Sequence, residues 1–154
     1  MQMKTSYGEK MLRSFVKKVF QNEKIYFNVR LKQIVNPETN MPLELDIFIP
    51  EKKLAFEFHG RQHKTDEYQR YKDKIKRQKC KEIGIHLFEI WTANLNKDLL
   101  QRIEKECTTL GIKITTPSTT FLNKFDKLGN EYKKQIYKMN AKIHSKTFVS
   151  KKGK

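Results

Sequence analysis

This chain of 154 residues is poor in cysteine and in long hydrophobic runs, and both deficits exclude classes of protein. Two cysteines, Cys80 and Cys107, are too few for a disulfide framework, so we expect a reducing, cytoplasmic compartment. No apolar run approaches the roughly 18 residues that cross a bilayer, and the first residues lack the apolar core of a secretory signal. The sequence therefore predicts an intracellular protein with no membrane partner.

Acidic residues are also in short supply, because lysine and arginine dominate. The chain has 33 Lys and Arg against 17 Asp and Glu, so its formal net charge is +16. Residues 61–81 hold nine basic and three acidic residues, and residues 116–154 hold ten lysines and two acids. Charge of this sign and size favours a nucleic acid as the partner. A solvated surface that serves only solubility is the alternative.

The spacing of apolar residues predicts a mixed α/β fold. Helical periodicity follows a capping box formed by Ser6 and Glu9, and apolar alternation marks the strands. The predicted elements, in chain order, are a helix over 7–21, strands over 25–35, 43–49 and 54–59, a helix over 66–83, a strand over 85–91 and a helix over 95–110. Short turns make the first three strands a meander, and the helical crossover lets the fourth strand lie parallel to a neighbour.

The composition changes near Thr115, which divides the chain into a predicted core (1–113) and a lysine-rich extension (114–154). The first residues of the extension, 115–120, are typical of a linker or a helix cap. Sparse apolar residues then recur at helical spacing among lysines, which predicts one or two basic amphipathic helices and a frayed tail. The extension either follows a nucleic-acid backbone or packs on the core through Phe121, Phe125 and Leu128, and the two roles are compatible.

Two acids on one predicted hairpin form the candidate site. Asp46 and Glu57 lie on the more polar faces of their strands, and the tight turn from Pro50 to Lys53 predicts that they face each other with Cβ atoms about 5 Å apart. Like charges in this position are destabilising, and Mg²⁺ prefers a few carboxylate oxygens plus water. Glu9 borders the apolar face of the first helix and is a third candidate, with the capping box alone as its alternative role.

Three further polar residues follow Glu57 closely: His59, Gln62 and His63. His59 projects from the same strand face as Glu57, and the group as a whole predicts a functional cluster rather than only a polar loop. A catalytic zinc site at His59 and His63 is a weaker alternative, since carboxylates on strands suit magnesium better.

A family resemblance covers about residues 5–110. It rests on the acidic hairpin, with strands Leu-Asp-Ile-Phe-Ile-Pro (45–50) and Leu-Ala-Phe-Glu-Phe-His-Gly-Arg-Gln-His (54–63), on the Ser-x-x-Glu helix before it and on the Asp-x-x-Lys helix (73–76) after it. These features resemble the PD-(D/E)xK, or restriction-endonuclease-like, superfamily. They are most similar to its small phage and mobile-element branch with the signature Glu-x-(Asp/His)-Gly-x-Gln-His, which is related to very-short-patch-repair endonucleases. The resemblance implies an α-β-β-β-α-β-α core and a phage-encoded nuclease.

The resemblance also implies a metal site and a mechanism. Asp46, Glu57 and the Phe58 carbonyl would bind Mg²⁺, for which Mn²⁺ can substitute, and Glu9 would contact a ligand water or a second metal. The metal would activate a water and neutralise charge on the scissile phosphate.

The chain departs from the family pattern at one position, because the lysine of Glu-x-Lys is replaced by His59. Gln62 or His63 would then orient the attacking water, and His59 would act as general base or line the site. A lysine from farther along the chain would supply the missing cation, and three are open candidates: Lys64, Lys74 and Lys76. A degenerate, inactive site is the alternative.

The sequence thus predicts a metal-dependent DNA endonuclease that hydrolyses phosphodiester bonds, of the homing, mismatch-nicking or junction-resolving kind. Its expected partner is double-stranded or branched DNA, and double-strand cleavage would require a homodimer. The residues expected to bind the nucleic acid are Arg61, Lys64, Lys72, Lys76, Arg77, Lys79, Lys133, Lys134 and Lys138. The alternative is a non-catalytic basic nucleic-acid-binding protein, whose acid pair is structural and tied to Lys or Arg across the sheet.

Overall fold

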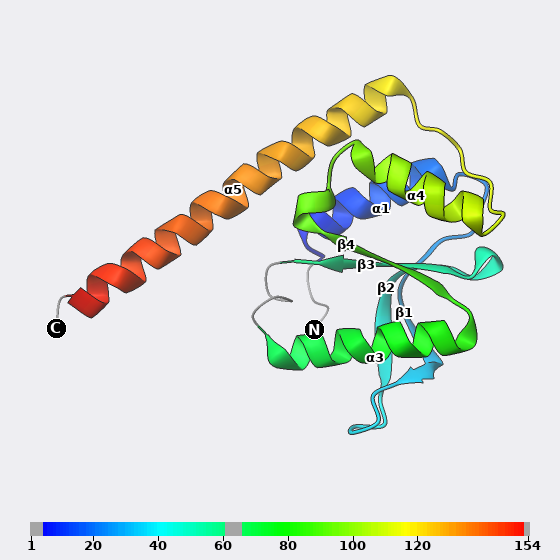
Figure 1. Ribbon diagram of the computed structural model, residues 1–154, viewed down its shortest axis with the longest axis horizontal. Coiled ribbons are helices and arrows are strands. Elements are labelled where there is room, and N and C mark those ends of the chain that lie inside the picture. Colours follow the sequence, from blue (N-terminus) through cyan, green and yellow to red (C-terminus); the bar gives the residue numbers. More distant parts are fainter. Residues whose placement is uncertain (1–4, 61–65, 153–154) are drawn as a thin grey trace.

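A four-stranded sheet carries the fold, and helices lie on both of its faces (Figure 1). The computed structural model describes residues 5–60 and 66–152, with side chains up to residue 142. Its elements are α1 (Tyr7–Val19), β1 (Tyr26–Val35), β2 (Pro42–Ile49), β3 (Leu54–His59), α3 (Glu67–Ile83), β4 (His86–Trp91), α4 (Asp98–Thr109) and α5 (Thr119–Lys152), with short 3-10 helices η1 (Pro50–Lys52) and η2 (Thr92–Asn94). The predicted mixed α/β fold class is confirmed.

The strands lie in the order β1-β2-β3-β4. β1, β2 and β3 pair antiparallel, whereas β3 and β4 are parallel, as expected for strands joined by a helical crossover. The β2–β3 hairpin has the predicted register, because Ile47 faces Phe56 and Ile49 faces Leu54. Lys53 closes the turn in the left-handed conformation, at φ 51°.

Two apolar clusters attach the helices to the sheet. On one face α1 and α4 pack over Ile47, Phe56 and Phe88, and the last two rings stack with centroids 4.6 Å apart. On the other face α3 contributes Ile75 and Cys80. α3 has few apolar side chains, so this second cluster is the smaller one.

The first turn of α1 lies unusually close to the sheet. The predicted capping box starts the helix, since the Glu9 N–H donates to Ser6 Oγ at 3.2 Å. One residue earlier, a Cβ at Gly8 would lie 2.2 Å from the Phe58 ring. Glycine is therefore required there, because its missing side chain lets α1 rest on Phe58.

The helix predicted over 95–110 begins later, at Asp98. Two side-chain oxygens explain the shift: the Asp98 N–H donates to Asn96 Oδ1 and the Lys97 N–H to Asp126 Oδ1, both at 3.0 Å. Because these oxygens satisfy N–H groups at the start of the helix, α4 begins after Asn96.

The lysine-rich extension forms one helix, α5, which continues to Lys152. The predicted frayed tail, which ends at residues 151–154, is therefore wrong for Lys151 and Lys152, and its last two residues lie outside the described residues. No proline occurs between Thr119 and Lys152, so nothing interrupts the helix once its first turns are packed. The described part of the chain contains no helix that is long and apolar enough to span a membrane.

The first half of α5 belongs to the core. Phe125 is 4% exposed, and its ring centroid lies 4.6 Å from that of Phe15. A Cβ at Gly129 would lie 1.7 Å from the Leu95 carbonyl oxygen, so the helix backbone rests directly on the segment after η2. The predicted boundary between residues 113 and 114 falls between α4 and α5, and the second half of α5 extends away from the core (Figure 1).

Candidate functional site

The candidate site lies where β2 and β3 separate. Their paired register ends at Ile47 and Phe56, and continuing it places Asp46 opposite Glu57, as the sequence predicted. The Phe58 N–H donates to Asp46 Oδ2 at 2.8 Å. The Asp46 carboxylate therefore takes the place of a strand partner for β3, and the two acids lie together at a fork in the sheet.

Lys76 brings a cation to this acid pair from α3. Its Nζ lies 3.2 Å from Glu57 Oε1, and the two residues are only 8% and 2% exposed. Burial alone would lower the pKa of Lys76, but Glu57 and Asp46 raise it above 10.5, so the ammonium stays charged. Of the three lysines left open by the sequence, Lys74 is exposed and Lys64 lies outside the described residues.

Three carboxyl groups share the site and perturb one another. Burial and then the Asp46 carboxylate raise the pKa of Glu57 well above 4.5, although Lys76 opposes the shift. Burial and Asp46 also raise the pKa of Glu9 to about 7, against the lowering effect of Arg13. Glu9 Oε1 is buried and forms no hydrogen bond with any described residue, and Arg13 Nη2 pairs with it at 3.7 Å. An additional positive charge would relieve this arrangement.

The edge strand is irregular beside Asp46. The register of β1 with β2 places Asn28 opposite Asp46, and Asn28 has a left-handed φ of 54°. The pairing then shifts between Arg30 and Val35. Asparagine tolerates the left-handed region better than most residues, so the irregularity is built into the sequence. Asp46 consequently lies between the left-handed Asn28 on β1 and the end of the paired register with β3.

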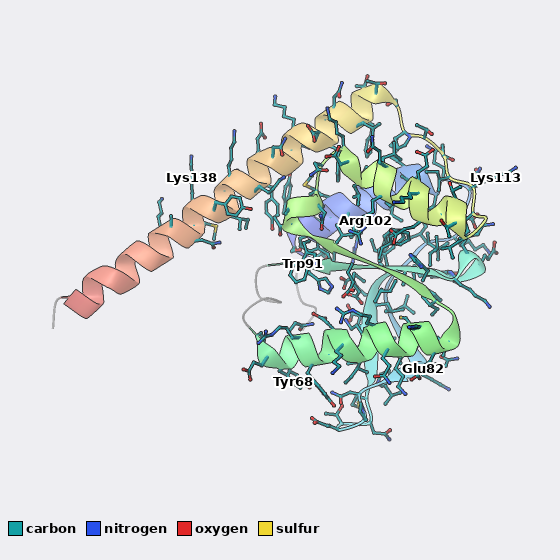
Figure 2. The ribbon with its side chains drawn as sticks, in the orientation of Figure 1. Tyr68, Glu82, Trp91, Arg102, Lys113 and Lys138 are labelled. Carbon is teal, nitrogen blue, oxygen red and sulfur yellow. The ribbon has the colours of Figure 1, made fainter. Side chains whose placement is uncertain are left out.

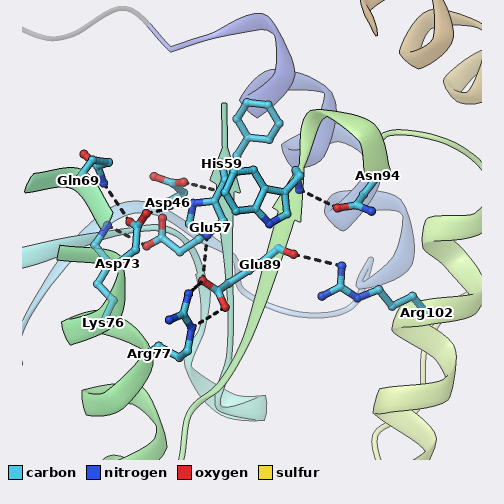
Figure 3. A network of polar contacts seen from close by, with 12 residues as sticks. Asp46, Glu57, His59, Gln69, Asp73, Lys76, Arg77, Glu89, Asn94 and Arg102 are labelled. Carbon is cyan, nitrogen blue, oxygen red and sulfur yellow. Dashed lines mark hydrogen bonds and ion pairs between the residues drawn. The ribbon is translucent and has the colours of Figure 1, made fainter. Parts of the chain in front are cut away.

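A second polar cluster lies beside the acid pair (Figure 3). His59 is 1% exposed, and its Nε2 lies 3.0 Å from Glu89 Oε1 while its Nδ1 lies 3.6 Å from Asp73 Oδ2. The ring packs against Trp91 with centroids 4.7 Å apart. Gln69 Nε2 donates to Asp73 Oδ1 at 3.0 Å. Both ring nitrogens of His59 therefore face carboxylates.

Glu89 joins this cluster to α3. Arg77 donates two hydrogen bonds to its carboxylate, at 2.8 and 2.6 Å. Burial would raise the pKa of Glu89, but hydrogen bonds from His59 and Arg77 lower it to about 2. Glu89 has the same register position on β4 as Glu57 on β3. Consecutive residues of α3, Lys76 and Arg77, therefore pair with glutamates on neighbouring strands.

The sequence analysis did not single out Glu89, Trp91 or Arg102. The signal for Glu89 was present, because it is the only acid in the strand over 85–91. Arg102 Nη1 donates to the Glu89 carbonyl oxygen at 3.1 Å from α4 (Figure 3). No local pattern indicates this contact, since it joins the strand to a helix that follows it in the chain.

The basic residues predicted on α3 differ in their surroundings. Lys76 and Arg77 are engaged with carboxylates of the sheet. Lys72 Nζ lies 4.8 Å from the centroid of the Tyr68 ring. Lys79 pairs with Glu82 at 3.4 Å near the other end of the helix. The structure therefore turns two of the four toward the sheet and leaves two beside neighbours on the helix surface.

On α5, Lys133 donates to the Ala93 carbonyl oxygen at 3.3 Å, whereas Lys134 is exposed. Lys138 is also exposed (Figure 2). Phe58, a predicted metal ligand, is fixed by its N–H and its ring. The remaining predicted site residues, Arg61, Gln62, His63 and Lys64, lie outside the described residues.

The acid pair suits one kind of metal. Within residues 5–60 and 66–142, no group of three or more His, Cys, Asp or Glu side chains is arranged to hold a metal ion. Mg²⁺ needs fewer protein ligands, because it keeps several waters and binds through one or two carboxylates. Asp46 and Glu57 supply that number.

Known proteins match this chain only in part. No protein family and no solved structure matches it. It is similar to Uncharacterized protein 094L of Frog virus 3 (isolate Goorha), with 37% identity over 81 residues; the match covers 44% of this chain and 51% of the viral protein. The chain thus spans about half the length of the curated relative it matches. The similarity is compatible with a viral origin.

Proposed function

We propose that this chain is a metal-dependent endonuclease that hydrolyses phosphodiester bonds of DNA. The observation that carries the proposal is the meeting of Asp46, Glu57 and Lys76: two carboxyls at a fork in the sheet, with an ammonium 3.2 Å from one of them. The formal charge of +16 supports a polyanionic substrate. The resemblance to PD-(D/E)xK nucleases, which assigns these same two acids to the metal, supports the reaction class.

Asp46 and Glu57 would hold a divalent cation such as Mg²⁺, or Mn²⁺ in its place. The raised pKa values of Glu57 and Glu9 both indicate a site with too little positive charge. When bound, such an ion neutralises charge on the scissile phosphate and lowers the pKa of a water. The Asp46 and Glu57 carboxyls determine where the positive charge of the ion lies.

Lys76 takes the role of the lysine that the Glu-x-Lys pattern lacks at position 59. Its ammonium is charged and buried, so it orients Glu57 and adds fixed positive charge where negative charge develops on the phosphate. Burial and Asp46 raise the pKa of Glu9 to about 7, so its carboxylate can accept a proton from a water close to neutral pH.

His59 serves as a positioning residue in this proposal. Its two nitrogens are occupied by Glu89 and Asp73, so it is poorly placed to accept a proton from water. It ties the last residue of β3 to β4 and α3, and this contact fixes Glu57 two residues earlier. Since the described chain contains one such acid pair, cutting both strands of a duplex would require two copies of the protein.

A non-catalytic DNA-binding protein is the second candidate, and one observation favours it. Glu57 pairs with Lys76 across the layers of the fold, which is how a purely structural acid would be satisfied. Asp46 differs, because it accepts a backbone N–H and faces two other carboxyls. A structural role explains Glu57 but leaves the repulsion around Asp46 without a purpose.

Nicking of supercoiled plasmid tests the proposal. We expect nicking in Mg²⁺ or Mn²⁺ that stops with EDTA and falls by about a hundredfold or more in Asp46→Asn and Glu57→Gln. Glu104→Gln, an exposed acid on α4, is the matched control and should cut like the wild type. Binding without cleavage in every divalent metal, or full activity in Asp46→Asn, would favour the non-catalytic alternative.

A further inference from the structure

The second half of α5 extends beyond the core. Phe125 and Gly129 are buried, but from Lys134 to Lys142 every side chain is exposed or half-buried. Figures 1 and 2 show the helix leaving the domain, with Lys138 on the projecting part. We call residues 133–152 the arm. At 1.5 Å per residue, the arm is about 30 Å long.

The arm has charge of one sign. From residue 133 to the C-terminus the chain contains eight lysines and no Asp or Glu, so this segment supplies half of the formal net charge. Lys127, Lys134, Lys138 and Lys142 recur at intervals of seven and four residues, which places them along one face of the helix. The ammonium groups of the arm have no acid within it to pair with.

The arm begins at the end of the sheet where the candidate site lies. Lys133 donates to the Ala93 carbonyl oxygen, two residues after Trp91, and Trp91 is the register partner of His59 on β3. On the other side, the Tyr132 ring lies 5.1 Å from that of Tyr7, in the first turn of α1. The close contact of Gly129 with Leu95 fixes the direction in which the arm leaves the core.

We propose that the arm is a docking surface for the sugar-phosphate backbone of duplex DNA, to one side of the candidate site. The choice of DNA as substrate rests on the proposed function. An arm of about 30 Å spans about nine base pairs, at 3.4 Å per base pair. The substrate is therefore an extended duplex segment that continues past the position of cleavage.

Charge favours this occupant over the alternatives. Pairing with the arm of a second copy would bring two lysine-rich helices together, with repulsion and no compensating acid. A membrane-bound helix needs a continuous apolar face. The large exposed hydrophobic side chains on the described part of the arm are Tyr137 and Met139, which is a small area for insertion.

The test measures binding in EDTA, so that it does not depend on cleavage. Duplexes of about 10 and about 30 base pairs are titrated with full-length protein by fluorescence anisotropy, between about 50 and 200 mM salt. The arm variant carries Lys134→Gln, Lys138→Gln and Lys142→Gln, all at exposed positions. The matched control removes the same charge from exposed positions on α3, on α4 and after α4, by Lys81→Gln, Lys105→Gln and Lys113→Gln.

We expect the wild type to bind the longer duplex more tightly and the arm variant to lose that gain. The slope of log affinity against log salt should fall by up to about 2.7 in the arm variant, since each lost phosphate contact contributes about 0.9. The control should keep the length dependence. The proposal would be overturned if the arm variant and the control variant showed the same length dependence and salt slope. It would also be overturned if the arm variant kept its affinity for DNA and lost affinity only for anionic vesicles. Absence of nicking by the wild type would overturn the nuclease proposal and leave this result standing.

Discussion

Replacement of Lys76 by methionine removes the positive charge that opposes the effect of Asp46 on buried Glu57. Methionine keeps much of the volume, so the change is mainly electrostatic. An ion pair at 3.2 Å corresponds to about 5 kcal/mol at an effective dielectric constant near 20. Breaking a buried pair by removing one partner costs about 3–5 kcal/mol. We expect Lys76→Met to lower the melting temperature by roughly 10 °C.

The pH dependence identifies the cause of this loss. The pKa of Glu57 in the folded state lies above 4.5, so the folded state binds its proton more tightly than the unfolded state. Stability therefore falls as pH rises from 4.5 through the folded pKa. Without Lys76 that pKa rises further, so the cost of Lys76→Met should be small near about pH 5 and large near about pH 8.

Urea denaturation at both pH values measures the effect, with Lys81→Met on the exposed end of α3 as the control. The control should change stability by less than about 0.5 kcal/mol. Adding Glu57→Gln to Lys76→Met removes the buried charge and should restore most of the loss. A loss that is equal at both pH values and unaffected by Glu57→Gln would refute the electrostatic explanation.

Three further results are expected. Gly8→Ala should destabilise the fold by about 1–3 kcal/mol in urea denaturation, because its Cβ would meet the Phe58 ring at 2.2 Å. Mg²⁺ should raise the melting temperature more as pH rises through 7, because loss of the proton of Glu9 (pKa about 7) adds a negative charge beside Asp46, and Asp46→Asn should abolish the shift in a thermal-shift assay. Glu89 has a pKa of about 2 instead of 4.5, so it stabilises the fold above pH 4.5 and loses this effect as pH falls toward 2; Glu89→Gln should flatten the acid limb of an unfolding curve.

The sequence was sufficient for the sheet and for the acid pair. Strict alternation gave the faces of β2 and β3, and a turn ending at Lys53 left a single register that places Asp46 opposite Glu57. Both depend on local chemistry, which a sequence displays directly. The same applies to the start of α1, where Ser6 accepts the Glu9 N–H.

Long-range pairings were not accessible in this way. α3 has few apolar residues, so its periodicity does not determine whether Lys74 or Lys76 faces the sheet; packing of Ile75 and Cys80 decides it. Arg77 meets Glu89 only because the crossover sets α3 against β4. The sequence also left open whether the extension forms one helix or two, since docking of its first turns on the core stabilises the rest.

Both outer strands of the sheet are protected against addition of a strand from another molecule. An exposed strand presents free N–H and C=O groups that invite aggregation. On β1, the left-handed Asn28 and the later shift in pairing break up that row of groups. On β4, the Arg102 guanidinium covers the Glu89 carbonyl oxygen. A strand added to the sheet would therefore meet an irregular edge at β1 and an engaged Glu89 carbonyl oxygen at β4.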